Sequence, residues 1–158
     1  MTPQKEPQRS LPWPPILYVG AVALAIVAHF LLPLPWIGPP MDGLLFAIGW
    51  VVAAGAVAME AAAMRAMMRA RTTIRPDRPP DHLVTSGPFS FTRNPIYLGN
   101  TMLMIGIGLI SGILWFPILA LVAAFATRKL AIEREEKLLA ARFGKAFRDY
   151  SRRVRRWI

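Results

Sequence analysis

The sequence contains no cysteine and only two histidines, His29 and His82, in 158 residues. The absence of cysteine excludes a disulfide framework, a thiolate zinc site and a cysteine nucleophile. Two histidines are too few for a histidine-based metal cluster. Charged residues are also scarce, at 18% of the chain, whereas apolar residues make up 54%. This composition excludes a disordered acidic tail and a collagen-like fibre, and it leaves about one domain rich in apolar sequence.

The apolar residues form long blocks that predict membrane spans. Residues 16–32 carry no formal charge, and residues 43–64 carry only Glu60. A block of 17 residues is at the short end of a transmembrane helix. A cleaved signal peptide is the competing interpretation for 16–32, but Pro-Leu-Pro-Trp follows it rather than a small-residue cleavage site. Residues 1–15 contain five prolines, so we expect a disordered lead-in.

A third block, 96–127, is too long for one straight span. A helix of that length would rise about 48 Å, beyond the hydrocarbon core of about 30 Å. Gly112 and Pro117 interrupt it, among other turn formers. We therefore predict a hairpin of two spans, 96–111 and 114–127, with one tilted and kinked helix as the alternative.

The basic residues predict the orientation. With four spans, all 19 lysines and arginines fall on one side of the membrane, and the loop 33–42 on the other side has none. This pattern places both termini in the cytoplasm, at the inner membrane if the source is bacterial. It also explains the net charge of +10 by topology and contact with anionic lipid, so nucleic acid is not the expected partner.

Residues 128–158 have the pattern of an amphipathic helix. Ile132, Leu139, Phe143, Tyr150 and Val154 recur on one helical face, and the opposite face is basic. Gly144 is a candidate bend. The predicted fold class is therefore all-α: an integral membrane bundle of about four transmembrane helices. Residues 16–158 form one domain, with a C-terminal hairpin, a cytoplasmic loop at 65–95 and a cytoplasmic C-terminal helix.

Two segments on the cytoplasmic side carry candidate chemistry. The first, 81–99, is rich in turn formers and aromatics, and Asn94-Pro95 has the pattern of a capped helix start. Such a start can bind an anionic group. The second is Glu133-Arg134-Glu135-Glu136. For Glu133 we predict ordinary salt bridges, whereas Glu135 and Glu136 lie near the bilayer, where an unpaired charge is costly.

Together these segments resemble a known family. Leu-Val-Thr-Ser-Gly-Pro-Phe, Arg-Asn-Pro-Ile-Tyr-Leu-Gly and Glu-Arg-Glu-Glu-Lys-Leu-Leu occur in this order, followed by Arg-Phe-Gly and Val-Arg-Arg-Trp. They are similar to the motifs of the isoprenylcysteine carboxyl methyltransferases, which are related to the membrane phospholipid methyltransferases. The resemblance covers about residues 72–158, while the first two spans match only in hydropathy.

The resemblance implies an integral membrane methyltransferase that uses S-adenosylmethionine and acts on a lipophilic or amphiphilic acceptor from the bilayer. It implies that Glu135 takes the ammonium group of the cofactor. It also implies a set of cofactor contacts before and at the start of the hairpin: His82, Leu83, Val84, Phe89, Asn94, Pro95, Ile96 and Tyr97. The catalytic residue stays open, with Arg93, Arg134 and Glu136 as candidates.

Departures from the family pattern bear on the acceptor. Many relatives have His in place of Asn94 and Tyr in place of Phe89, and Ala131 stands where eukaryotic relatives have a substrate-binding Arg. A prenylcysteine substrate is therefore in doubt. A carboxylate acceptor is favoured because it needs no base, whereas an amine or thiol must first lose a proton. The alternatives are a non-catalytic scaffold or lipid-binding protein of the same fold, or a reductase of the sterol-reductase type using NADPH.

Overall fold

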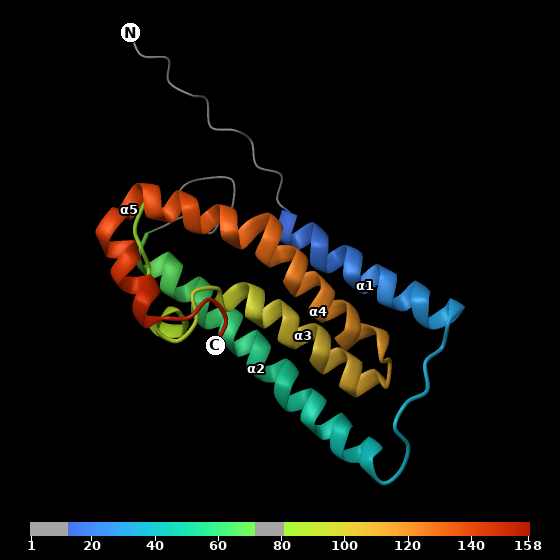
Figure 1. Cartoon of the computed structure of the whole chain (residues 1–158). Helices are drawn as coiled ribbons and strands as arrows, with labels where there is room; N and C mark the ends of the chain where they lie inside the picture. The colour runs from blue at the N-terminus through green and yellow to red at the C-terminus, as the bar shows by residue number, and fades with distance from the viewer. Residues whose placement is uncertain (1–12, 72–80) are drawn as a thin grey trace.

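The structure, a computed structural model, describes residues 13–71 and 81–158, and these residues are helical and contain no strand. Figure 1 shows their arrangement. The all-α fold class is thus confirmed for this part of the chain. The helices are α1 (Trp13–Leu31), α2 (Met41–Arg69), a short 3₁₀ helix η1 (Gly87–Ser90), α3 (Pro95–Ser111), α4 (Trp115–Thr127), a π-helical turn η2 (Arg128–Ile132) and α5 (Glu133–Arg153).

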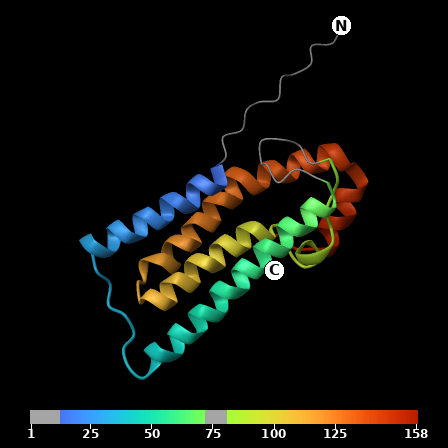
Figure 2. The same ribbon diagram turned by 180° about the vertical axis from the view of Figure 1, so that it is seen from behind.

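Helices α1 to α4 alternate in direction along the bundle. α3 and α4 are the arms of the hairpin, α2 packs along α3, and α1 packs along α4. The view from behind in Figure 2 shows the same neighbours. As a result the end of α2, the start of α3, the end of α4 and the start of α5 all lie at one end of the bundle (Figure 1). The two candidate motifs, before and at the start of α3 and at the start of α5, therefore lie at the same end of the bundle.

The hairpin is confirmed, and the alternative of one kinked helix is wrong. α3 ends at Ser111, and Gly112 adopts a left-handed conformation with φ 69°, which is favourable for glycine. Its N–H donates to the carbonyl of Gly108. A Cβ on Gly108 would lie 2.5 Å from Cδ of Pro117, so glycine permits the two arms to meet closely.

Two helices differ from their predicted bounds. α1 begins at Trp13 rather than at residue 16, because Pro14 and Pro15 occupy its first turn, where a backbone N–H has no intrahelical acceptor to lose. α2 continues to Arg69 rather than ending at 64, so its last turns carry arginines beyond the apolar block. Residues 1–12 of the predicted lead-in and 72–80 of the predicted loop lie outside the described residues.

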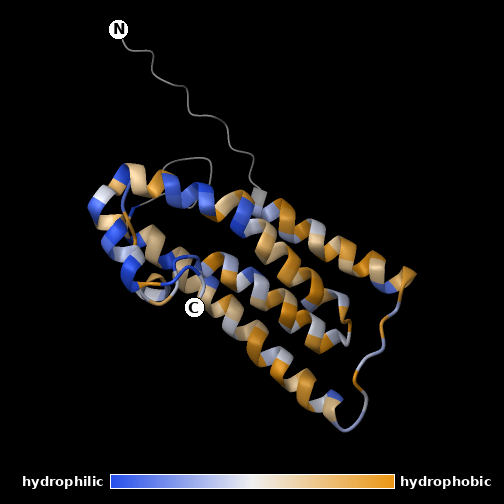
Figure 3. Cartoon of the chain, viewed as in Figure 1, coloured by the Kyte–Doolittle hydropathy of each residue, from blue (hydrophilic) through white to orange (hydrophobic). Residues whose placement is uncertain are grey.

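The helices are suited to a membrane. α1, α2 and the continuous helix from Trp115 to Arg153 are each long and apolar enough to cross a bilayer, and α3 is a shorter apolar helix. Large apolar side chains are exposed along them; Phe30, for example, is 80% exposed. Figure 3 shows the apolar residues spread over the four-helix bundle and the hydrophilic ones gathered on α5 and the C-terminal segment. This distribution fits lipid around the bundle and water around one end.

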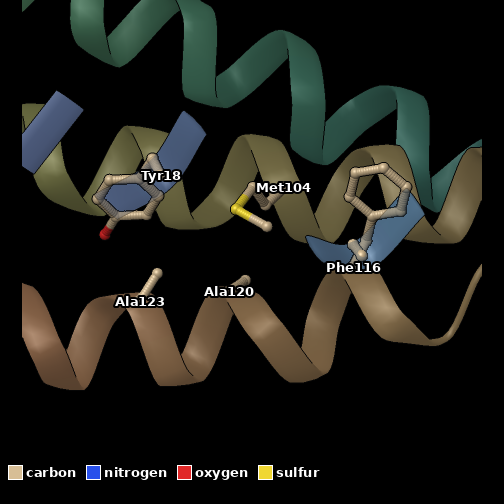
Figure 4. Packing of buried hydrophobic residues seen from close by; sticks show 6 residues of the cluster. Tyr18, Met104, Phe116, Ala120 and Ala123 are labelled. Atoms are coloured by element: carbon tan, nitrogen blue, oxygen red, sulfur yellow. The ribbon is translucent and has the colours of Figure 1, made fainter. Parts of the chain in front are cut away.

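The core of the bundle is built from small residues and a few large ones. Tyr18, Met104 and Phe116 pack with alanines of α1 and α4 between the helices (Figure 4). α2 and α3 also approach closely: a Cβ on Gly49 would lie 2.9 Å from the carbonyl oxygen of Gly106. Small residues allow such backbone contact between membrane helices, where apolar burial alone drives little association.

α5 bends sharply at Gly144, which was the predicted candidate bend. Gly144 has φ 52° and ψ −117°, a conformation that side-chain-bearing residues rarely adopt. After the bend, Phe147, Tyr150 and Val154 form a second buried cluster, and Leu83 of the loop before η1 packs on it. The prediction of a helix to residue 158 was wrong, because α5 ends at Arg153 and Val154 is extended.

Candidate active site

The two predicted motifs meet at the end of the bundle. The hydroxyl of Tyr97, in the first turn of α3, donates a hydrogen bond of 2.6 Å to Oε1 of Glu135, in the first turn of α5. The residues are far apart in sequence, and the α3–α4 hairpin brings them together. This hydrogen bond is the centre of the candidate site.

Buried contacts hold the first turn of α3 and the start of α5 in place. Pro95 begins the helix and is fully buried. From α1, the hydroxyl of Tyr18 donates to the carbonyl of Tyr97 at 3.1 Å and is 2.7 Å from the hydroxyl of Thr101. The π-helical turn η2 then carries the chain from α4 into α5, and Ile132 within it is completely buried. These contacts fix the two elements that carry Tyr97 and Glu135.

Glu136 is fully engaged by arginines. Nε and Nη2 of Arg156 donate to its two carboxylate oxygens at 2.9 Å and 2.6 Å. Nη1 of Arg93 lies 3.2 Å from Oε1 of the same carboxylate, and the Arg93 guanidinium also lies over the ring of Phe147. Two of the three catalytic candidates, Arg93 and Glu136, are therefore partners in one ion-pair cluster that ties α5, the loop before α3 and the C-terminal segment together.

Glu135 differs from its neighbour. Tyr97 donates a hydrogen bond to it, but none of the described lysines or arginines forms an ion pair with it. Burial raises the pKa of the Glu135 carboxyl; the hydrogen bond from Tyr97 opposes this shift, and the charge of Glu136 adds to it. A half-buried carboxylate beside a neutral hydroxyl is well placed to accept a cationic group from a ligand.

Asn94 has a different role from the one predicted. It occupies the N-cap position of α3, but its side chain makes no capping hydrogen bond. Instead, its Nδ2 donates to the carbonyl of Arg156 at 2.8 Å. The neighbouring backbone N–H of Arg93 donates to the carbonyl of Arg155 at 3.0 Å. The prediction of a side-chain cap was therefore wrong, because the C-terminal segment competes for the Asn94 amide.

The other predicted residues differ in their exposure and contacts. Phe89 is half-buried, and its carbonyl accepts a hydrogen bond of 2.7 Å from the Tyr150 hydroxyl. Arg134 is exposed on α5 and makes no side-chain hydrogen bond or ion pair with the described residues. Within the loop and the start of α3, His82 is exposed, while Leu83, Val84 and Ile96 are half-buried.

Glu133 behaves as predicted. Its Oε1 lies 3.2 Å from Nζ of Lys129 and 3.6 Å from Nε of Arg128. The hydrogen bond from Lys129 is the main cause that lowers the pKa of the Glu133 carboxyl. The partners of Glu133, Arg128 and Lys129, are different from those of Glu135 and Glu136.

Sequence reasoning missed two residues that shape the site, Tyr18 and Arg156. Tyr18 lies in an apolar block, where a single hydroxyl is the only signal that it could have a polar partner. Arg156 is one of many basic residues in the C-terminal segment, and its spacing does not distinguish it from the exposed ones. Only the reversal of the chain after Gly144 identifies it.

Long apolar helices with a polar cluster at one end define the class as helical membrane proteins. Comparison with known proteins then identifies the family. The family model for phospholipid methyltransferases matches residues 44–146, well over half of the chain. The chain therefore belongs to the phospholipid methyltransferase family, a family of membrane methyltransferases, and the resemblance seen in the motifs is confirmed.

A relative among curated proteins is similar over part of its length. The nickel-cobalt-cadmium resistance protein NccN of Alcaligenes xylosoxydans xylosoxydans is 41% identical over 73 residues, which are 46% of this chain and 33% of that protein. The chain thus spans a third of the relative that it matches. No solved structure matches the chain.

Proposed function

We propose that the protein binds S-adenosylmethionine at the Tyr97–Glu135 pair and transfers its methyl group to a lipophilic or amphiphilic acceptor from the bilayer. Membership of the family supports methyl transfer as the class of reaction. The observation that carries the proposal is Glu135: a half-buried carboxylate with a neutral donor and no ion pair among the described residues. Such a group suits the ammonium of the methyl donor.

The residues of the site match the parts of this donor. Glu135 would accept a charge-assisted hydrogen bond from the ammonium group. The first backbone amides of α3, at Ile96 and Tyr97, have no intrahelical acceptor and would take the carboxylate. Phe89 and Tyr97 offer aromatic surface for the adenine. When bound, the donor supplies a methyl group on a positively charged sulfur, so the task of the protein is to orient the two reactants.

The chain offers few residues for proton transfer at this site. It has no cysteine, and Arg93 and Glu136 are already paired with each other. A carboxylate acceptor attacks without losing a proton, whereas an amine or a thiol must lose one. We therefore favour a carboxylate acceptor, with an amine or thiol as the alternatives.

Calorimetric titration of the detergent-purified protein with S-adenosylmethionine tests the proposal. We expect saturable binding, with affinity reduced about tenfold or more in Glu135→Ala, because a charge-assisted hydrogen bond is lost. Glu133→Ala is the matched control: it removes a carboxylate from the same helix turn, and binding should stay unchanged.

Other outcomes of the titration would favour one of the alternative functions. A folded protein that binds no S-adenosylmethionine contradicts the proposal and favours a non-catalytic membrane scaffold. Binding of NADPH in its place favours the reductase alternative. If the cofactor binds, incubating the protein with radiolabelled S-adenosylmethionine and a lipid extract, followed by base treatment, separates the acceptors: methyl esters are released by base, whereas N-methyl and S-methyl groups are retained.

A further inference from the structure

The C-terminal segment 154–158 forms part of the candidate site. Its main chain accepts hydrogen bonds from both residues before α3: Arg155 from the N–H of Arg93 at 3.0 Å, and Arg156 from Asn94 Nδ2 at 2.8 Å. Val154, 8% exposed, anchors the segment in the cluster with Phe147 and Tyr150. These contacts position the side chain of Arg156 against α5.

Arg156 binds Glu136 through two parallel hydrogen bonds. This geometry is the strong, directional form of an arginine–carboxylate pair. Arg93 adds a second positive charge on Oε1 of the same carboxylate. The groups that face Glu135 are the Tyr97 hydroxyl from α3 and the carboxylate of Glu136 from its own helix. Repulsion between the adjacent glutamates therefore depends on how well Glu136 is neutralised.

We infer that Arg156 is a positioning residue for the methyl donor. Its guanidinium neutralises Glu136, so that Glu135 can hold a full negative charge and bind the donor's ammonium. The inference rests on the proposed function, because it presumes that the donor binds at Glu135. It assigns a role in ligand binding to a residue that does not touch the ligand and that lies ten positions beyond the end of the family match at residue 146.

The test compares S-adenosylmethionine affinity across pH in Arg156→Met and in Arg153→Met. Arg153→Met removes the same charge from an exposed side chain outside this segment and should match the wild type. In Arg156→Met we expect binding on the order of fivefold weaker near neutral pH, with the weakening at acidic pH beginning at a higher pH, because Glu135 is harder to ionise. Arg156→Lys keeps the charge and should recover most of the affinity.

The double variant Arg156→Met/Glu136→Gln separates this role from a merely structural one. Removing the repelling carboxylate should restore the affinity and the original pH profile. Equal weakening at every pH with no rescue would overturn the inference. If Arg156→Met does not fold, Glu136→Gln alone provides the test: it should retain binding and extend it to lower pH, and loss of binding in the folded variant would also overturn it. Absence of binding in the wild type would instead contradict the proposed function.

Discussion

At the scale of single residues, Glu60 is one of three described residues that have a buried side-chain polar atom without a hydrogen-bond partner. Its Oε1 is buried and has no hydrogen-bond partner among the described residues. The side chain lies over Gly99 of α3, where a Cβ would come within 2.5 Å of its Cγ. Glycine at 99 therefore provides the space that this carboxyl group occupies. An ionisable group kept in such surroundings is costly to the fold, and function is the usual reason for keeping one.

We predict that Glu60→Met stabilises the protein. The substitution removes a buried oxygen without a partner, which costs about 1–3 kcal/mol, and keeps a flexible apolar side chain of similar length. Thermal unfolding in detergent, followed by tryptophan fluorescence, should show a higher midpoint. A lower midpoint would contradict this prediction. A higher midpoint together with lost methyl transfer would mark Glu60 as a functional residue retained at the expense of stability.

Glu135 predicts how donor binding depends on pH. Burial raises the pKa of its carboxyl, so it takes up a proton at a higher pH than an exposed glutamate does. The protonated form cannot pair with an ammonium. We therefore expect the affinity for S-adenosylmethionine to fall as the pH is lowered, beginning at a higher pH than the ordinary pKa of a glutamate would give. Calorimetry at several pH values measures this fall.

The control for this pH dependence is Glu135→Gln. It removes the titrating group and keeps the shape of the side chain, so its weaker binding should be nearly independent of pH over the same range. A pH profile in Glu135→Gln that still matched the wild type would assign the titration to another group.

At the scale of elements, the contact between α2 and α3 depends on glycine. A Cβ on Gly49 would lie 2.9 Å from both the carbonyl oxygen of Gly106 and the backbone N of Ile110, whereas a Cβ on Gly55, in the same helix, meets nothing within 4 Å. Backbone atoms cannot rotate away as side chains can. Gly49→Ala should therefore lower stability by about 1–3 kcal/mol.

Gly55→Ala is the matched control for this prediction. It should be neutral or stabilise by up to about 1 kcal/mol, because alanine favours the helix. Thermal unfolding of both variants in the same detergent gives the comparison. Equal behaviour of the two variants would mean that α2 and α3 do not approach as closely as the structure has them.

The bend in α5 gives a second prediction at this scale. Gly144 has φ 52°, and no atom within 4 Å would obstruct a Cβ, so an added methyl group acts through the backbone alone. Gly144→Ala should cost roughly 1–2 kcal/mol and loosen residues 145–158 from the loop before α3. Hydrogen exchange should increase at Arg93 and in the segment after 144, while Lys145→Ala, at an exposed position, should leave both unchanged.

The elements show how far the sequence predicts this structure. The apolar blocks identify four helices, because the bilayer demands long apolar segments whose backbone hydrogen bonds are internal. The third block is too long for one straight span, and its glycines and Pro117 identify the turn of the hairpin. The reversal after Gly144 is different. It depends on side chains of the loop at 81–93 that pack on Phe147 and Tyr150, and such long-range contacts leave no local pattern.

The site was predictable to the same extent. The motifs identified Tyr97 and Glu135, which the structure joins by a hydrogen bond. The resemblance assigned Glu135 to the cofactor and left Glu136 as a catalytic candidate, but no local pattern indicates that Glu136 is paired with arginines. That pairing depends on Arg156, which reaches Glu136 only through the folded C-terminal segment. The turn of Asn94 toward that segment was unpredictable for the same reason.

At the scale of the whole molecule, polarity is divided along the bundle axis. Hydrophilic residues concentrate on α5 and the C-terminal segment, and apolar residues cover the helices (Figure 3). α1 and α3 begin, and α2 and α4 end, at the polar end (Figure 1). A methyl donor from the cytoplasm and an acceptor from the bilayer could meet only where these regions adjoin. Tyr97 and Glu135 lie at this boundary.

This division predicts the topology. The basic residues in the last turns of α2 and on α5 belong to one end of the bundle, and an excess of basic residues is retained on the cytoplasmic side. Tags placed at either terminus should therefore be protected from protease in sealed right-side-out vesicles and be cleaved when the vesicles are opened. A cysteine introduced in the loop 33–40 should show the reverse, reacting with an impermeant maleimide in intact vesicles; the chain's lack of cysteine makes this label specific. Cleavage of only one terminal tag in sealed vesicles would mean an odd number of spans; if that tag were the C-terminal one, the Tyr97–Glu135 site would face the wrong compartment for a cytoplasmic donor.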